Sequence, residues 1–211
     1  MTLQNRVTPD GRIIADAARG TMMGNRGILH DENRVLGKAR WRHANWVACR
    51  LQFNARHRQI MAPRRYTELF FLDEAVAFAA GHRPCGECRR SDYLHFKAAW
   101  AHHNGGQALD AKALDRTLHA QRVISRKRQQ KRFQGDLATL PAGAFVLLAD
   151  DLEHKQPFLV LEDCLLAYSP SGYGVPIKRS NNAAVTVLTP PGILDAFRAG
   201  YVPALHPSAR I

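Results

Sequence analysis

The sequence lacks long hydrophobic runs and has few acidic residues. No apolar run approaches the ~18 residues of a membrane-spanning helix, and residues 1–12 carry no apolar segment typical of a secretory signal. We therefore expect a cytoplasmic protein with no membrane partner. Only 18 Asp and Glu oppose 30 Lys and Arg, which gives a formal net charge of +12. This excess favours polyanions such as nucleic acid as partners.

The sequence also lacks several common catalytic motifs. It contains no Walker loop, no Rossmann glycine pattern after a strand and no nucleophile elbow. Its four cysteines, Cys49, Cys85, Cys88 and Cys164, are too few and too unevenly spaced for a disulfide framework. Metal binding is therefore the first explanation to consider for the close pair.

The first half of the chain predicts short strands followed by helices. Turn-rich hairpins or loops are expected near the N-terminus, strands at 45–53, 57–61 and 66–72, and helices at 74–80, 91–103 and 108–121. In the first of these strands, Val47, Cys49, Leu51 and Phe53 share one face, which we expect to be buried.

The second half predicts a small sheet closed by a helix. β-like runs occur at 144–149, 158–161, 164–169 and 183–188. For the closing helix, Thr189 can serve as N-cap, Pro190 suits the first position and Gly200 follows the end. The pattern predicts an α+β fold with three units: a metal-binding module at 1–105, a basic helix and arm at 106–136, and a β-rich unit at 137–211.

The most specific motif is Cys85-Gly-Glu-Cys88, which lies between two predicted helices. Two thiolates with this spacing can bind one zinc ion, and Gly86 would relieve strain in the tight turn. A redox-active Cys-x-x-Cys remains an alternative, although such motifs normally follow a strand. We expect zinc, with Cys85 and Cys88 as ligands.

The residues around this motif carry a family resemblance. Phe70-Phe71, the helix at 74–80 and Gly81-His-Arg-Pro-Cys-Gly-Glu-Cys-Arg89 resemble the second half of the metal-binding domain of the Ada DNA-repair proteins, over about twenty residues. In that family four cysteines hold zinc, and one accepts a methyl group from a DNA phosphotriester. The resemblance implies an Ada-like zinc-knuckle module, a DNA partner and a role in handling DNA damage.

The first half of the family motif is only partly present. Its Cys-x-x-x-Cys pattern is matched by Cys49 at the first position, but Phe53 stands at the second. His57 is the nearest replacement ligand, with His30 and His82 as rivals, and Cys49 can equally be a small core residue. An imidazole in place of a thiolate makes the site less negative, which disfavours methyl transfer.

Clustered arginines are the expected nucleic-acid contacts. Arg64, Arg65, Arg83, Arg89 and Arg90 surround the knuckle, and the run 122–132, with Arg126 and Arg128, has six basic residues and no acidic one. Such surfaces bind backbone phosphates without reading sequence. DNA is favoured over RNA, but an RNA-binding protein remains an alternative.

Two arrangements point instead to catalysis. Asp115 and His119 are one helical turn apart, so the carboxylate could orient a general base. His30 follows the glycine-containing stretch 24–27, which could bind a phosphate. The alternative function is therefore a nucleic-acid-processing enzyme, such as a nuclease or base-processing enzyme, with a structural metal.

Overall fold

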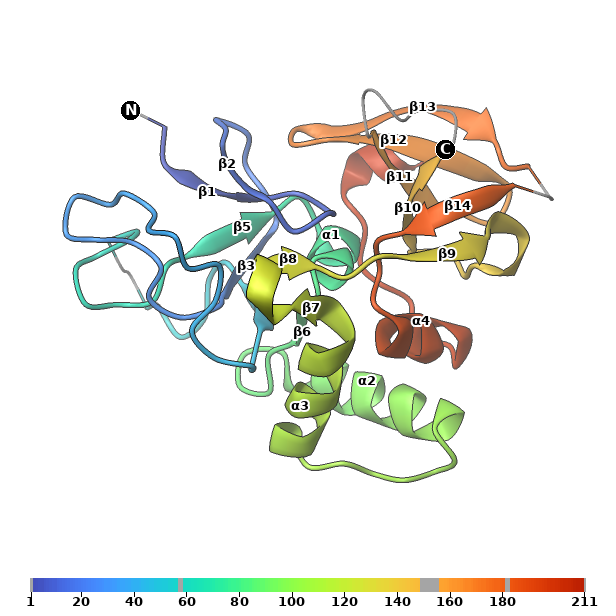
Figure 1. Ribbon diagram of the computed structural model, residues 1–211, viewed down its shortest axis with the longest axis horizontal. Coiled ribbons are helices and arrows are strands. Elements are labelled where there is room, and N and C mark those ends of the chain that lie inside the picture. Colours follow the sequence, from blue (N-terminus) through green and yellow to red (C-terminus); the bar gives the residue numbers. More distant parts are fainter. Residues whose placement is uncertain (1, 57–58, 149–155, 181–182, 211) are drawn as a thin grey trace.

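The protein folds into two six-stranded sheets with helices packed beside them (Figure 1). The computed structural model describes residues 2–56, 59–148, 156–180 and 183–210. The expected α+β class is confirmed by this mixture of sheets and a few helices. No helix in these ranges is both long and apolar enough to cross a membrane.

The first sheet is built from the N-terminal half of the chain. Its strand order is β2-β1-β5-β3-β4-β6. Most neighbours are antiparallel, but β1 runs parallel to β5 and β4 runs parallel to β6. The strands are β1 (Gln4–Val7), β2 (Ile13–Ala15), β3 (Met22–Asn25), β4 (Val47–Arg50), β5 (Leu69–Phe71) and β6 (Arg83–Pro84).

Two details of the predicted strands in this half are wrong. Residues 60 and 61, the end of the predicted strand 57–61, form a turn, in which Met61 has a φ of 54°. Strand β4 ends at Arg50, so Leu51 is 49% exposed. Ala48, on the opposite face from the predicted one, is the strand's fully buried residue, at 1% exposure.

The second sheet is antiparallel and has the order β13-β12-β11-β10-β14-β9. Its edge strand β13 was not predicted, because it contains Pro176 and mostly exposed residues; proline is tolerated at a sheet edge. Strand β9, within the predicted arm, pairs with β14. The strands are β9 (Phe133–Asp136), β10 (Phe145–Leu148), β11 (Pro157–Val160), β12 (Cys164–Ser169), β13 (Gly172–Lys178) and β14 (Ala184–Val187).

The helices are α1 (Glu74–Ala79), α2 (Arg90–His103), α3 (Ala111–Arg122) and α4 (Pro191–Arg198). The predicted cap of α1 is present, because the Asp73 carboxylate accepts a hydrogen bond from the backbone N–H of Val76 at 2.9 Å. The predicted cap of α4 is wrong: Pro190 is the N-cap residue. The Thr189 hydroxyl instead accepts from the backbone N–H of Phe145 at 2.9 Å, which ties α4 to the second sheet.

Apolar packing joins the three predicted units. One cluster combines Phe71 of the first sheet with Phe145 and Tyr168 of the second. A second cluster brings together α1, α2, α3 and α4 through buried residues that include Phe78, Phe96, Leu118 and Phe197. The helices and both sheets therefore share buried surfaces across the predicted boundaries at 105 and 136.

The basic arm forms a small hairpin. Strand β7 (Val123–Ile124) pairs with β8 (Gln129–Gln130), and a short 3₁₀ turn at Ser125–Lys127 connects them. Arg128 completes the turn in the left-handed conformation, with a φ of 53°. Figure 1 shows the hairpin between the two sheets, above α3. Nη1 of Arg128 donates to the carbonyl of Lys38 at 3.3 Å, so the hairpin contacts the loop between β3 and β4.

Candidate metal centre and cationic cleft

Three cysteines meet where the parallel strands β4 and β6 end. Ala48 pairs with Pro84 in this register, so the residues that follow them, Cys49 and Cys85, lie side by side. The backbone N–H of Cys85 donates to the carbonyl of Ala48 at 3.0 Å, which extends the pairing beyond β6. The sheet register therefore brings together two cysteines that are 36 positions apart in the sequence.

A tight turn before α2 supplies the third cysteine. The backbone N–H of Arg89 donates to the carbonyl of Cys85 at 3.1 Å and directs Cys88 back toward Cys85. Gly86 lies in this turn, as expected, but it is not among the glycines with a positive φ. Its lack of a side chain leaves room for the ring of Tyr93, which would lie 3.4 Å from a Cβ atom there.

The sulfur atoms of Cys49, Cys85 and Cys88 lie within 4.8 Å of one another. Three thiols at this separation can hold a metal ion, so Cys49 lies in one group with Cys85 and Cys88. Cys49 and Cys85 are half-buried and Cys88 is buried, and all three are free thiols. Cys164 lies in β12 of the other sheet.

Hydrogen bonding within the cluster favours one thiolate. The hydrogen bond from the Cys49 thiol lowers the pKa of Cys85 to about 5. The same hydrogen bond raises the pKa of Cys49, and burial raises the pKa of Cys88. Among the three thiols, Cys85 is therefore the one whose pKa favours the thiolate. The thiolate is the form in which cysteine binds metals.

The expected fourth ligand, His57, lies outside the described residues. Its chain neighbour Arg56 donates to the carboxylate of Glu87, within the knuckle, at 2.7 Å. The rival His82 is fully buried and packs against Phe71, with 4.6 Å between ring centroids. Among residues that the structure describes, the group able to hold a metal consists of the three cysteines.

Two of the expected phosphate-binding arginines are buried in ion pairs. Arg83 donates through Nε and Nη2 to the two carboxylate oxygens of Asp115, at 2.8 and 2.6 Å. Arg89 donates to Glu74 at 2.5 Å and to Asp92 at 2.8 Å. The arginine side chains are at most 6% exposed. They connect α2 and the knuckle to α1 and α3, and their burial keeps them from a phosphate at the surface.

The other predicted contacts are on the surface. Arg64, Arg65, Arg90, Arg126 and Arg128 are all exposed. Their role in binding nucleic acid stays a prediction.

The structure also separates the expected catalytic pair. Both carboxylate oxygens of Asp115 accept from Arg83, whereas Nδ1 of His119 lies 3.5 Å from Nη2 of Arg122. Burial, together with the charge of Arg122, lowers the pKa of His119. Asp115 therefore pairs with Arg83 and does not orient His119.

The third expected catalytic residue, His30, is buried and both of its ring nitrogens have polar partners. It is 8% exposed, its Nδ1 lies 2.6 Å from the Thr67 hydroxyl, and its Nε2 lies 3.2 Å from the carbonyl oxygen of Ala62. Both ring nitrogens therefore have partners within the loops of the first sheet. Neither nitrogen is directed at a solvent-facing site.

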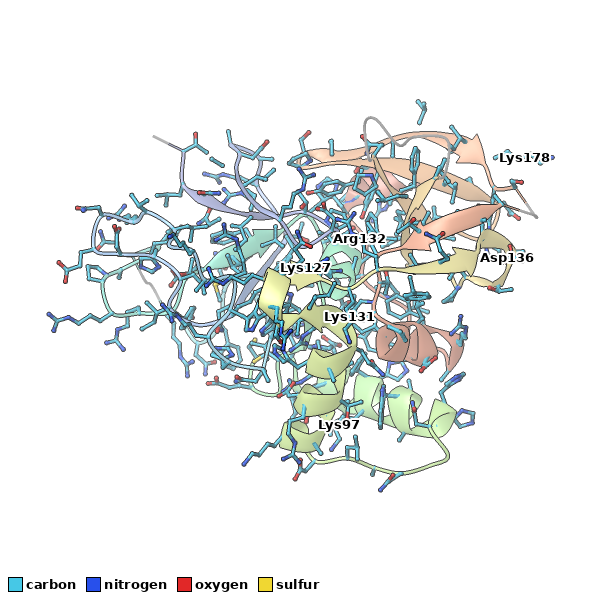
Figure 2. The ribbon with its side chains drawn as sticks, viewed as in Figure 1. Lys97, Lys127, Lys131, Arg132, Asp136 and Lys178 are labelled. Atoms are coloured by element: carbon cyan, nitrogen blue, oxygen red, sulfur yellow. The ribbon has the colours of Figure 1, made fainter. Side chains whose placement is uncertain are left out.

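A cationic cleft lies between the first sheet's loops and the β7–β8 hairpin. Its volume is about 810 Å³, and seven basic residues and one acidic residue line it. Figure 2 shows Lys127 and Arg132 along the segment that bridges the two sheets. The lining residues are Asp10, Gly11, Arg12, Arg26, Lys38, Arg40, Trp41, Trp46, Ile124, Lys127, Arg128, Gln129, Gln130 and Arg132.

The floor of the cleft contains a buried tryptophan held between two cations. The guanidinium carbons of Arg26 and Arg122 each lie 4.2 Å from the centre of the Trp46 ring. Arg26 and Arg122 are 2% and 0% exposed. Burial lowers the pKa of each to about 9, so both remain protonated at neutral pH.

Only one wall of this cleft was expected from the sequence. The basic run 122–132 supplies Lys127, Arg128 and Arg132, but the opposite wall from the 38–46 segment was missed. A signal was available, because Lys38-Ala-Arg-Trp-Arg-His43 interleaves basic and aromatic residues. The contribution of Arg26 could not have been recognised without the sheet.

Comparisons of the chain with protein-family models, with curated proteins and with solved structures find no match.

Proposed function

We propose that this protein binds nucleic acid, with DNA preferred, and that the cationic cleft is its binding surface. The observation that carries the proposal is the lining of the cleft, in which seven basic residues accompany a single acidic one. The acidic residue, Asp10, is already paired with Arg12 and Arg132 at 2.8 and 3.2 Å. The cleft therefore keeps a large positive charge, which attracts phosphates.

The metal in this proposal is zinc, held by Cys49, Cys85 and Cys88 with His57 as the proposed fourth ligand. Sulfur and imidazole donors suit tetrahedral zinc. Bound there, zinc would tie the end of β4 to the turn before α2. The ion has a structural role in this scheme, and the Ada-like identity of the module and its part in handling DNA damage rest on the resemblance described above.

Metal analysis of purified protein tests the ligand set. We expect about one zinc per chain in the wild type and loss of zinc in both Cys85→Ser and Cys49→Ser. Cys164→Ser is a matched control, since Cys164 lies in the other sheet, and it should retain zinc. Retention of zinc by Cys49→Ser would show that Cys49 is not a ligand. A wild-type protein that binds no metal would refute the proposed metal site.

Equilibrium binding to fluorescent duplex DNA, single-stranded DNA and structured RNA tests the proposed function. Each backbone contact contributes about 0.9 to the slope of log affinity against log salt for duplex DNA and about 0.7 for a single strand. The double variant Lys127→Gln/Arg128→Gln should therefore lower the slope by about 1.4 to 1.8, if both side chains contact phosphate. Both residues are exposed and line the cleft.

Lys178→Gln serves as the control for charge. Lys178 ends strand β13 at the far edge of the second sheet, well away from Lys127 and Arg132 in Figure 2. An equal loss of affinity in this control and in the cleft variant would mean that overall charge, and not the cleft, drives binding. Absence of binding to all three probes at low salt would refute the function.

A further inference from the structure

Arg26 at the floor of the cleft is a buried cation whose partners in the structure are neutral. Its Nη2 donates to the carbonyl of Ala80 at 3.1 Å, and longer contacts of 3.4 Å reach the carbonyl of Gly11 and Nε2 of His82. A guanidinium has five N–H donors. In the described chain no carboxylate forms an ion pair with it, although buried charges are normally paired.

Behind Arg26, Arg122 adds a second positive charge and His82 adds none. Arg122 lies on the same Trp46 ring, and burial together with the charges of Arg26 and Arg122 keeps the pKa of His82 well below its ordinary value, so its imidazole is neutral. Arg26 itself lines the cleft. A ligand that enters the cleft therefore meets a desolvated cation, and an anion placed there would supply the missing charge.

The size of the cleft limits the ligand. A volume of about 810 Å³ falls in the range of about 300–1,000 Å³ that encloses small organic ligands. This volume is sufficient for a nucleotide and its immediate neighbour. Arg26 is only 2% exposed at the floor of the cleft, so a strand must offer an end or an unpaired residue to reach it.

An aromatic wall is available for a base. The guanidinium groups of Arg26 and Arg122 both lie against the Trp46 ring, which is only 2% exposed. Trp41 is half-buried and lines the same cleft. Indole rings are the side chains on which unpaired bases stack, so Trp41 is the aromatic group in the lining that can receive a base.

We infer that the cleft is a nucleotide-phosphate site: Arg26 binds a phosphate monoester, and Trp41 stacks on the attached base. The phosphate can belong to the 5′ end of a strand or to a free nucleotide, because the recognising chemistry is the same. The inference rests on the proposed function, since it specifies which part of a nucleic acid the cleft receives. It makes the protein a reader of phosphorylated strand ends.

The test compares short thymidine oligonucleotides of equal length with a 5′-phosphate or a 5′-hydroxyl, bound to the full-length metal-loaded protein. We expect the phosphorylated strand to bind about tenfold to a hundredfold more tightly, the effect of one charged hydrogen-bonded contact. Thymidine monophosphate should compete and thymidine should not. Inorganic phosphate should compete more weakly than thymidine monophosphate, because it lacks the base.

Two variants assign the residues. Arg26→Gln should abolish the preference for phosphate, so that the phosphorylated and the hydroxyl strand bind this variant with equal affinity. Trp41→Leu should reduce affinity for both strands and for thymidine monophosphate, and leave inorganic phosphate unaffected. Lys178→Gln again controls for charge. If Arg26→Gln does not fold, the wild-type comparison and Trp41→Leu still decide the question.

The possible failures are distinguishable. Equal affinity for both oligonucleotides would overturn the inference and leave nucleic-acid binding intact. Competition by inorganic phosphate as strong as that by thymidine monophosphate would overturn the role of Trp41. Binding of thymidine monophosphate without binding of any strand would support the site for free nucleotides and refute the proposed function.

Discussion

The buried ion pair between Arg83 and Asp115 provides a sharp test of how the knuckle is supported. The Arg83 and Asp115 side chains are 6% and 8% exposed, and two hydrogen bonds join them. Asp115→Ala removes the carboxylate and leaves the guanidinium buried, with the carbonyl of Pro84 at 3.0 Å and the Tyr93 ring as its remaining contacts. Breaking such a pair from one side costs about 3–5 kcal/mol of stability.

This loss is large enough to measure by thermal unfolding. For a chain of this size, about 1 kcal/mol corresponds to about 2–4 °C in Tm, so we expect Tm to fall by about 6–20 °C. Urea unfolding should give the same loss in free energy through a lower midpoint with an unchanged slope. The loss should occur with zinc present, because the pair joins α3 to β6 independently of the metal.

Two controls separate the ion pair from general damage. Replacing both partners with apolar residues, Arg83→Met with Asp115→Leu, should restore most of the stability, since no charge is then stranded. Asp195→Ala removes surface contacts with Arg198 and His103, whose side chains are 39% and 43% exposed, and should cost at most about 1 kcal/mol. An Asp115→Ala protein as stable as Asp195→Ala would refute the reasoning.

Further predictions concern three histidines. Burial lowers the pKa of His82, so below about pH 6.5 the unfolded chain gains a proton that the folded protein does not bind. The contribution of His82 to the free energy of unfolding should therefore fall by about 1.4 kcal/mol per pH unit as the pH decreases. Urea unfolding of His82→Gln should lack this pH dependence, and an equal dependence in the wild type and the variant would contradict the prediction. His119→Ala should keep the wild-type affinity for nucleic acid. If the wild type cleaves nucleic acid and His119→Ala binds it without cleaving it, the alternative function as a nuclease is favoured. His30→Ala should lower Tm by about 2–8 °C without changing binding, since it removes buried hydrogen bonds worth about 1–2 kcal/mol together; unchanged Tm would exclude this structural role.

Local sequence patterns determined the helices and the positions of several strands of this protein. Residues 74–80 and 91–103 carry helical spacing around a two-cysteine turn, and the predicted limits lie within one residue of the observed helices. The signals are short-range: a capping carboxylate at Asp73, apolar periodicity and the spacing of Cys85 and Cys88. The excess of basic residues likewise follows from composition alone.

Only the tertiary structure decided which of these residues act together. Cys49 joins Cys85 because β4 and β6 run parallel in one register, and a chain pattern does not specify that pairing. Arg83 and Arg89 looked like surface residues, yet Asp115 and Glu74 neutralise them from other helices. The cleft combines segments near residues 10, 26, 40 and 130. Such contacts depend on the packing of distant elements, whereas propensity and periodicity act over a few residues.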